Sequence, residues 1–163
     1  MTTQSLFAAR QLERELKLHA RVLQAQVDGL SHGDSLIQPP DGGNCLNWLL
    51  GHIIVSRSTS LKLLGLELLA GDADYDRYNR NSDPLTQAEQ ALPLTRMLVD
   101  FGETQTRMLA RLAELGEDDL AAIPPGQERT VAEQLSFLSW HETYHVGQLE
   151  QLRRLAGKTE KVI

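Results

Sequence analysis

Cysteine is nearly absent from this sequence of 163 residues, because Cys45 is the only one. No internal disulfide can form, which favours a reducing compartment. No apolar run approaches the roughly 20 residues of a membrane-spanning helix, and Met1–Ser5 lacks the basic start and apolar core of a signal peptide. We therefore expect a soluble, cytoplasmic protein that consists of one domain over residues 1–163.

Clustered positive charge is also missing from the chain. The net charge is −6, and the 16 lysine and arginine residues are dispersed along the sequence. Nucleic acids and anionic membrane surfaces attract patches of basic residues. The sequence therefore predicts neither nucleic acid nor membrane as a partner.

No segment of any length alternates apolar and polar residues with the period of a β-strand. Instead, apolar positions recur three or four residues apart in four segments, the spacing that gives a helix one apolar face. The predicted helices are Ser5–Leu30, Asn44–Leu69 with Asn44 as N-cap, Asp83–Leu115 with a possible break at Pro93, and 130–156 with Thr130 as N-cap. The predicted fold class is all-α, a four-helix bundle.

Long polar connectors separate these predicted helices. The longest, residues 71–83, exceeds what two adjacent antiparallel helices need, so it would cross one end of the bundle. We favour a solvated crossover here, with a functional loop that carries Tyr75 and Tyr78 over a pocket as the alternative. Outside the connectors, His19 is interpreted as a hydrogen-bonded core residue and Cys45 as a small packed residue.

The last predicted helix carries the motif His141-Glu142-x-x-His145. Its two histidines are one turn apart on one helical face, so both imidazoles can bind one metal ion. The same motif occurs in zinc metalloproteases, where the glutamate acts as general base. No histidine follows His145, and no strand is predicted that could align a peptide substrate, so we do not favour a protease.

His52 is the better candidate for a third metal ligand. It lies on the apolar face of the second predicted helix, and metal sites are commonly built from facing helices in a bundle core. Three imidazoles suit Zn²⁺ and leave a position open for water or substrate, while Ni²⁺, Co²⁺, Fe²⁺ and Mn²⁺ are alternatives. From the spacing alone, three separate hydrogen-bonded core histidines explain the pattern equally well.

Two segments together resemble the DinB/YfiT-like superfamily of metalloenzymes, which is distinct from the DNA polymerase that shares the name DinB. They are Asn44-x-x-Asn47-Trp48-Leu49-Leu50-Gly51-His52 and His141-Glu142-x-x-His145-x-Gly147-Gln148. The resemblance covers nearly the whole chain. It implies an up-down-down-up bundle, often a homodimer, in which His52, His141 and His145 hold a divalent metal.

The resemblance also suggests an activity. Characterised members of the family include thiol-dependent enzymes, so it implies a metal-dependent S-transferase or hydrolase that acts on small electrophilic molecules in stress or detoxification. A low-molecular-weight thiol would be the co-substrate. Glu142 is the candidate catalytic residue, for proton transfer; the alternative is that it faces another helix, because it lies about 100° around the helix from His141. The alternative is a non-catalytic, stress-inducible bundle that works by dimerisation or by binding a small molecule.

Overall fold

The computed structural model describes residues 3–69, 72–85 and 87–163. These ranges contain helices and no strand, which confirms the predicted all-α class. The α-helices are α1 (Thr3–Val27), α2 (His32–Ser35), α3 (Leu46–Leu63), α4 (Leu94–Glu114), α5 (Glu117–Ala121) and α6 (Val131–Leu155), and two 3-10 helices are η1 (Asp72–Tyr78) and η2 (Ala88–Gln90). None of the helices in the described ranges is both long and apolar enough to span a bilayer.

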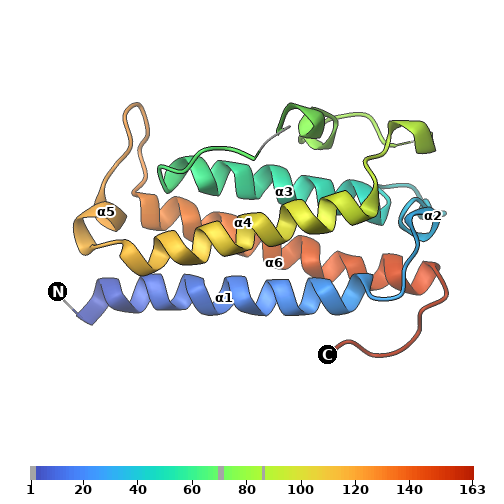
Figure 1. Cartoon of the computed structure of the whole chain (residues 1–163), viewed down its shortest axis with the longest axis horizontal. Helices are drawn as coiled ribbons and strands as arrows, with labels where there is room; N and C mark the ends of the chain where they lie inside the picture. The colour runs from blue at the N-terminus through green and yellow to red at the C-terminus, as the bar shows by residue number, and fades with distance from the viewer. Residues whose placement is uncertain (1–2, 70–71, 86) are drawn as a thin grey trace.

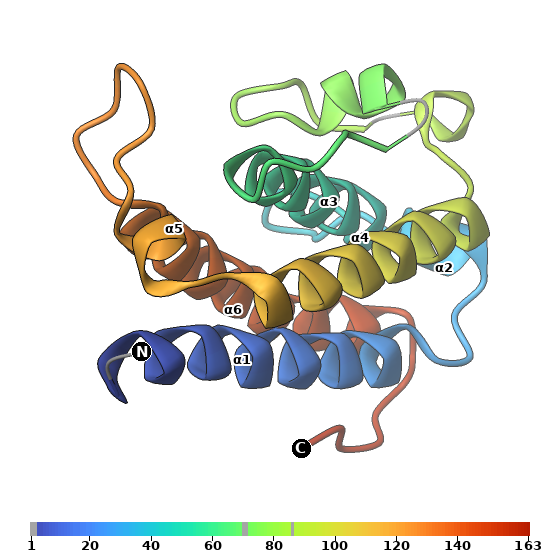
Figure 2. The same cartoon turned by 60° about the vertical axis from the view of Figure 1, so that its left-hand side comes forward.

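The four long helices α1, α3, α4 and α6 lie side by side (Figure 1). In that view α1 and α6 run in one direction along the molecule, and α3 and α4 run in the other. Helices α4 and α6 each contact both α1 and α3. The short helices α2 and α5 lie at opposite ends, and η1 packs on the outer side of α3 (Figure 2).

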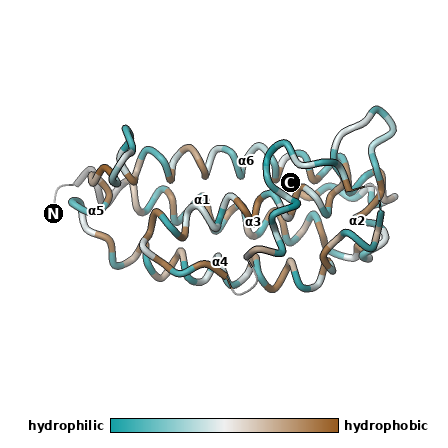
Figure 3. The backbone as a smooth tube through the Cα atoms, turned by 90° about the horizontal axis from the view of Figure 1, so that it is seen from above, coloured by the Kyte–Doolittle hydropathy of each residue, from teal (hydrophilic) through white to brown (hydrophobic). Residues whose placement is uncertain are grey.

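Apolar side chains from all four long helices meet between them. Figure 3 shows apolar and polar positions alternating along each of these helices, as the sequence pattern predicts. Residues without any exposed surface come from all four of these helices and include Leu23, Leu50, Ile53, Met97 and Leu149. Burial of such side chains provides most of the free energy that holds the helices together.

Helix α3 is shorter than the sequence analysis predicted. Its N-cap is Cys45 rather than Asn44, and its last residue is Leu63 rather than Leu69. The early end is explained by Gly65, whose φ of +69° is a left-handed conformation that glycine adopts without strain. The amide of Gly65 donates to the carbonyl of Lys62 and that of Leu66 to Leu61, which closes the last turn in a Schellman motif.

Helix α4 begins at Leu94, so the predicted start at Asp83 was wrong. Pro93 occupies the N-cap, and its ring would clash with a preceding helical turn. By contrast, α6 has the predicted capping box. The Thr130 hydroxyl accepts from the Glu133 amide at 3.2 Å, and the Glu133 carboxylate accepts from the Thr130 amide at 2.8 Å.

The crossover before α4 is not merely solvated, because Tyr75 and Tyr78 in η1 are both buried. The Tyr78 ring lies so close to Gly51 of α3 that a Cβ atom at Gly51 would overlap it. The Tyr78 hydroxyl donates to Asn47 Oδ1 at 3.0 Å and accepts from the Leu92 amide at 2.8 Å. Gly51 thus allows η1 to pack directly on the helix that carries His52.

Candidate metal centre

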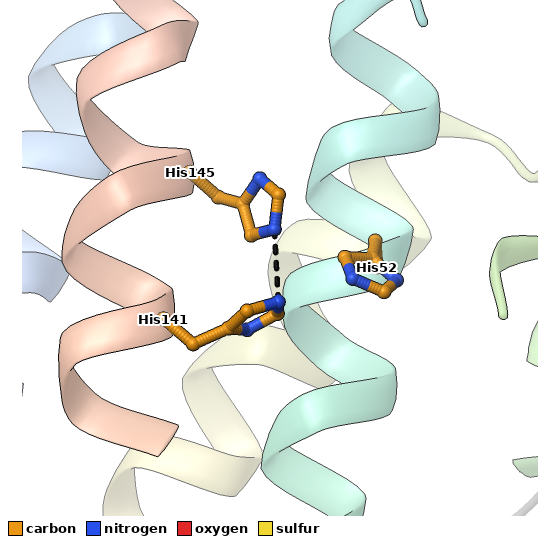
Figure 4. A group of neighbouring side chains, drawn as sticks. All are labelled: His52, His141 and His145. Carbon is orange, nitrogen blue, oxygen red and sulfur yellow. Dashed lines mark hydrogen bonds between the residues drawn. The ribbon is translucent and has the colours of Figure 1, made fainter. Parts of the chain in front are cut away.

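Three histidines from two helices converge between α3 and α6 (Figure 4). His141 and His145 are one turn apart on α6, and their Nε2 atoms are 3.0 Å apart. The ring of His52, on α3, has its centroid 5.1 Å from that of His141 and 5.0 Å from that of His145. One nitrogen of each ring lies within 4.8 Å of the others. The structure therefore brings together the three residues that the sequence analysis named as metal ligands.

Hydrogen bonds determine which ring nitrogen of His52 and His145 carries a proton. The Nδ1 atom of His52 lies 2.8 Å from the carbonyl oxygen of Tyr78, which can only accept, so this nitrogen donates. The Nδ1 atom of His145 likewise donates to Oε1 of Gln148 at 2.8 Å. In a neutral imidazole the second nitrogen then has a free lone pair. Both residues therefore offer Nε2 as a ligand atom.

For His141, the hydroxyl group of Ser56 determines which ring nitrogen carries the proton. The Ser56 hydroxyl donates to the carbonyl of His52, one turn earlier on α3, at 3.0 Å. Its oxygen lies 3.3 Å from Nδ1 of His141 and accepts the proton of that nitrogen. The Nε2 atom of His141 is thereby left without a proton. All three histidines then have a lone pair on Nε2, because a hydrogen bond holds the proton on each Nδ1, as it does for histidines that bind metals.

This arrangement fits a metal ion better than three independent core histidines. Two Nε2 lone pairs that face each other at 3.0 Å repel unless a cation or proton lies between them. Within the described ranges, the group that could hold a metal contains histidines and no carboxylate. Zn²⁺ accepts three imidazoles and keeps a further position open, and other divalent transition metals bind the same ligands.

Burial keeps the α6 histidines in the neutral form that binds metals. Burial lowers the pKa of His141 to about 4, and the neighbouring His145 and His52 lower it further in the same direction. Burial also lowers the pKa of His145, although the hydrogen bond to Gln148 opposes this shift. Protons therefore would not compete with a metal for these two candidate ligands near pH 7.

The wall behind His52 is made by residues that the sequence analysis did not connect with the site. The Trp48 ring stacks on His52, with centroids 4.9 Å apart and planes at 16°. The indole nitrogen of Trp48 donates to the Ser82 hydroxyl at 3.1 Å. Together with the Tyr78 carbonyl, this contact fixes the orientation of the His52 ring. A tryptophan one turn before a candidate ligand was the only signal for it in the sequence.

Glu142, the candidate catalytic residue of the sequence analysis, does not lie with the three histidines. It is buried on another side of α6, where its two carboxylate oxygens accept hydrogen bonds from Nε and Nη2 of Arg57 at 2.9 and 2.6 Å. Burial raises the pKa of Glu142, but the positive charge of Arg57, the nearby His19 and the hydrogen bonds from Arg57 lower it to about 2. Glu142 is therefore an anion held by a cation of α3.

This ion pair extends to the other two long helices. From α4, the Thr104 hydroxyl accepts from Arg57 at 3.2 Å, and the Phe101 ring lies 3.7 Å from the guanidinium carbon. From α1, Nδ1 of His19 lies 3.5 Å from a Glu142 oxygen, while its Nε2 is 2.7 Å from the Thr143 hydroxyl. His19 is thus a buried, hydrogen-bonded residue, as predicted. Arg57 was missed, although it is a lone charge in an apolar stretch.

The sequence comparison agrees with this geometry. The family model of the DinB superfamily matches residues 15–149, a range that includes all three histidines. A search of curated proteins found no match. Because the matched range covers most of the 163 residues, it confirms the resemblance drawn from the two histidine motifs. The chain belongs to the DinB superfamily.

Proposed function

We propose that this protein is a divalent-metal-dependent enzyme, a thiol-dependent S-transferase or hydrolase that acts on small electrophilic molecules. The observation that carries the proposal is the convergence of three Nε2 lone pairs, each oriented by a hydrogen bond at Nδ1. Three protein ligands and an open position are typical of catalytic rather than structural metal sites. Zn²⁺ suits these ligands best.

A bound divalent metal would supply a Lewis acid that lowers the pKa of a coordinated thiol or water. The residues of this chain would orient the site. Tyr78, Ser56 and Gln148 hold the three imidazoles in the tautomer that presents Nε2. Because Arg57 occupies both oxygens of Glu142, the contribution we propose for Glu142 is to hold α6 against α3.

Family membership supports the rest of the proposal. The directions of the long helices in Figure 1 support an up-down-down-up four-helix bundle, which we propose as one domain over residues 1–163. A homodimer in the cytoplasm and a role in stress or detoxification are proposed from the family alone. A low-molecular-weight thiol is the proposed co-substrate on the same basis.

Two measurements test the enzyme proposal. Protein purified without a metal-affinity tag should contain a divalent metal in near-stoichiometric amount by elemental analysis, or take it up on titration. The protein should then conjugate thiols to a panel of electrophiles, and His145→Ala should abolish that activity. His32→Ala is the matched control, because His32 is exposed and lies outside the histidine cluster. Absence of both metal and rebinding would refute the proposal.

The alternative is a bundle that binds small molecules without catalysis. It is favoured by exposed aromatic side chains beside the histidines, Phe137, Trp140 and Tyr144, which offer a binding surface that needs no metal. Under this alternative, His145→Ala changes stability, and no thiol conjugation is detected in either protein. The same panel of electrophiles therefore distinguishes the two functions.

A further inference from the structure

A cleft of about 560 Å³ opens between the connector at residues 126–129, α3 and the first half of α6. Phe137 and Leu138 form its apolar wall on α6, and Thr59 faces them from α3. The connector contributes polar groups to the cleft, among them one carboxylate and one guanidinium, Glu128 and Arg129. This volume is within the range of pockets that hold one small molecule.

The cleft adjoins the three histidines. The Phe137 ring stacks on the ring of His141, with centroids 6.3 Å apart and planes at 26°. On the opposite helix, Thr59 follows Ser56 by three residues, and Ser56 accepts the hydrogen bond of His141. Both walls of the cleft therefore reach the metal centre within about one helical turn, or roughly 5 Å.

Flat aromatic surfaces continue along the same edge of α6. Trp140 and Tyr144 are 62% and 56% exposed, and Phe137 is 50% exposed. The rings of Trp140 and Tyr144 stack with centroids 6.4 Å apart, and Tyr144 lies 5.2 Å from the ring of His145. Aromatic rings in such positions bind planar apolar groups by stacking and by burial of large areas.

A bound divalent metal would make the histidine site positive, although the whole chain has a net charge of −6. Three neutral imidazoles do not offset the charge of such a metal, and the carboxylate of Glu142, which follows His141 in α6, is already paired with Arg57. Arg80 adds a further positive charge. It lies between Tyr78, whose carbonyl binds His52, and Ser82, whose hydroxyl binds Trp48.

Those two contacts place the backbone turn that carries Arg80 beside His52 and Trp48 of α3. An anion at the opening would be attracted by both Arg80 and the metal.

We propose that the substrate is a small anion with a flat apolar body. The body would lie in the cleft against Phe137, and the negative charge would lie at the opening between the histidines and Arg80. This inference rests on the proposed metal-dependent function and specifies the class of molecule that the site takes.

Calorimetric titration of the Co²⁺-loaded protein with benzoate and with benzamide tests this proposal. The two probes share a flat ring and differ in charge. We expect benzoate to bind at least about fivefold more tightly than benzamide. Arg80→Gln should remove this preference, whereas Arg10→Gln, a control at an exposed arginine of α1, should retain it.

A second pair of variants tests whether the apolar body of the probe lies against Phe137. Phe137→Ala should weaken both probes by about tenfold, because the ring that contacts them is lost. Val99→Ala, at a side chain of α4 that is 68% exposed, should change neither affinity. Absorption of bound Co²⁺ in the visible range reports metal loading of every variant independently of the probes.

The outcomes separate this inference from the function on which it rests. A wild-type protein that takes up no Co²⁺ overturns both. A Co²⁺-loaded protein that binds neither probe, or binds benzamide as tightly as benzoate, overturns the substrate class and leaves the metal centre intact. Retention of the benzoate preference by Arg80→Gln overturns the role of Arg80, and unchanged affinities in Phe137→Ala overturn the role of the cleft.

Discussion

Replacement of the Arg57–Glu142 ion pair by apolar residues tests how α3 and α6 are held together. Both side chains are buried, and two hydrogen bonds of 2.6 and 2.9 Å join them. The environment lowers the pKa of Glu142 from 4.5 to about 2, against the effect of burial. A shift of this size corresponds to a stabilisation of about 3 kcal/mol at neutral pH.

The single variants Arg57→Met and Glu142→Leu each leave one buried charge without its partner. We expect each to reduce the free energy of unfolding by about 3–5 kcal/mol. The double variant removes both charges, so it should lose far less than the sum of the single variants. Urea denaturation at pH 7 measures the free energy of unfolding of the wild type, both single variants and the double variant. The circular dichroism spectrum of the wild type is the reference for an intact helical fold.

The pH dependence gives a second measure of the same pair. Because the pKa of Glu142 is lower in the folded state, its stabilisation is complete above pH 4.5 and is lost as the pH falls toward 2. The double variant has no Glu142, so it should not show this loss of stability at low pH. Two results would show that the pair does not stabilise the fold. One is a loss of less than about 1 kcal/mol in the free energy of unfolding of each single variant. The other is a loss in the double variant as large as the two single losses added together.

Three further predictions concern the metal centre. Gly51→Ala should lower the melting temperature and weaken Zn²⁺ binding about tenfold, because the new methyl group displaces Tyr78. Gly102→Ala is its matched control, since a Cβ atom there meets no other group within 4 Å. It should leave Zn²⁺ binding unchanged and should not lower the melting temperature, because alanine favours a helix interior more than glycine does. In the metal-free protein, NMR titration of the His141 ring should give a midpoint near pH 4, and a midpoint above pH 6 would contradict the burial of that ring. Gln148→Ala removes a hydrogen-bond acceptor from a ligand and should weaken Zn²⁺ binding about 10- to 100-fold in a chelator competition assay.

The histidine cluster was predictable because it depends on regular helical geometry. His141 and His145 share a face wherever residues 141–145 are helical, and His52 lies on the apolar face of its own helix. Two amphipathic helices that pack together bring such faces into contact. The resemblance to a known family then selected the pairing of α3 with α6, which spacing alone left open.

The surroundings of the cluster were not predictable in the same way. The proton on Nδ1 of His52 is held by a backbone carbonyl of η1, and any residue at position 78 offers such a carbonyl. Glu142 was interpreted as a proton-transfer group because it follows His141 in the motif. Its direction depends on the rotation of α6 about its axis, which brings it to Arg57. The pattern of apolar residues does not predict which charged side chains pair inside a bundle.

Helix boundaries were least predictable where proline and glycine compete with an apolar pattern. The pair Asp83-Pro84 suggested an earlier start for α4, because a capping residue followed by proline is typical of a first helical turn. However, Pro93 cannot continue a helix from the preceding residues. Beyond Gly65, Leu66 and Leu69 continue the apolar pattern of α3 into a segment that is no longer helical. In both cases the local backbone conformation overrides the pattern.

The connector between α5 and α6 is closed at its base, where the Val131 amide donates to the Ala122 carbonyl at 2.9 Å. Its ends are therefore held together whatever lies between them, and lengthening such a loop costs little free energy. The three histidines belong to rigid helices, whereas residues 126–129 of the cleft belong to this connector. Insertions or exchanges here would change which molecules fit the cleft without moving any of the three histidines. If the proposed function is correct, selectivity can be redesigned, or can diverge between relatives, separately from metal binding.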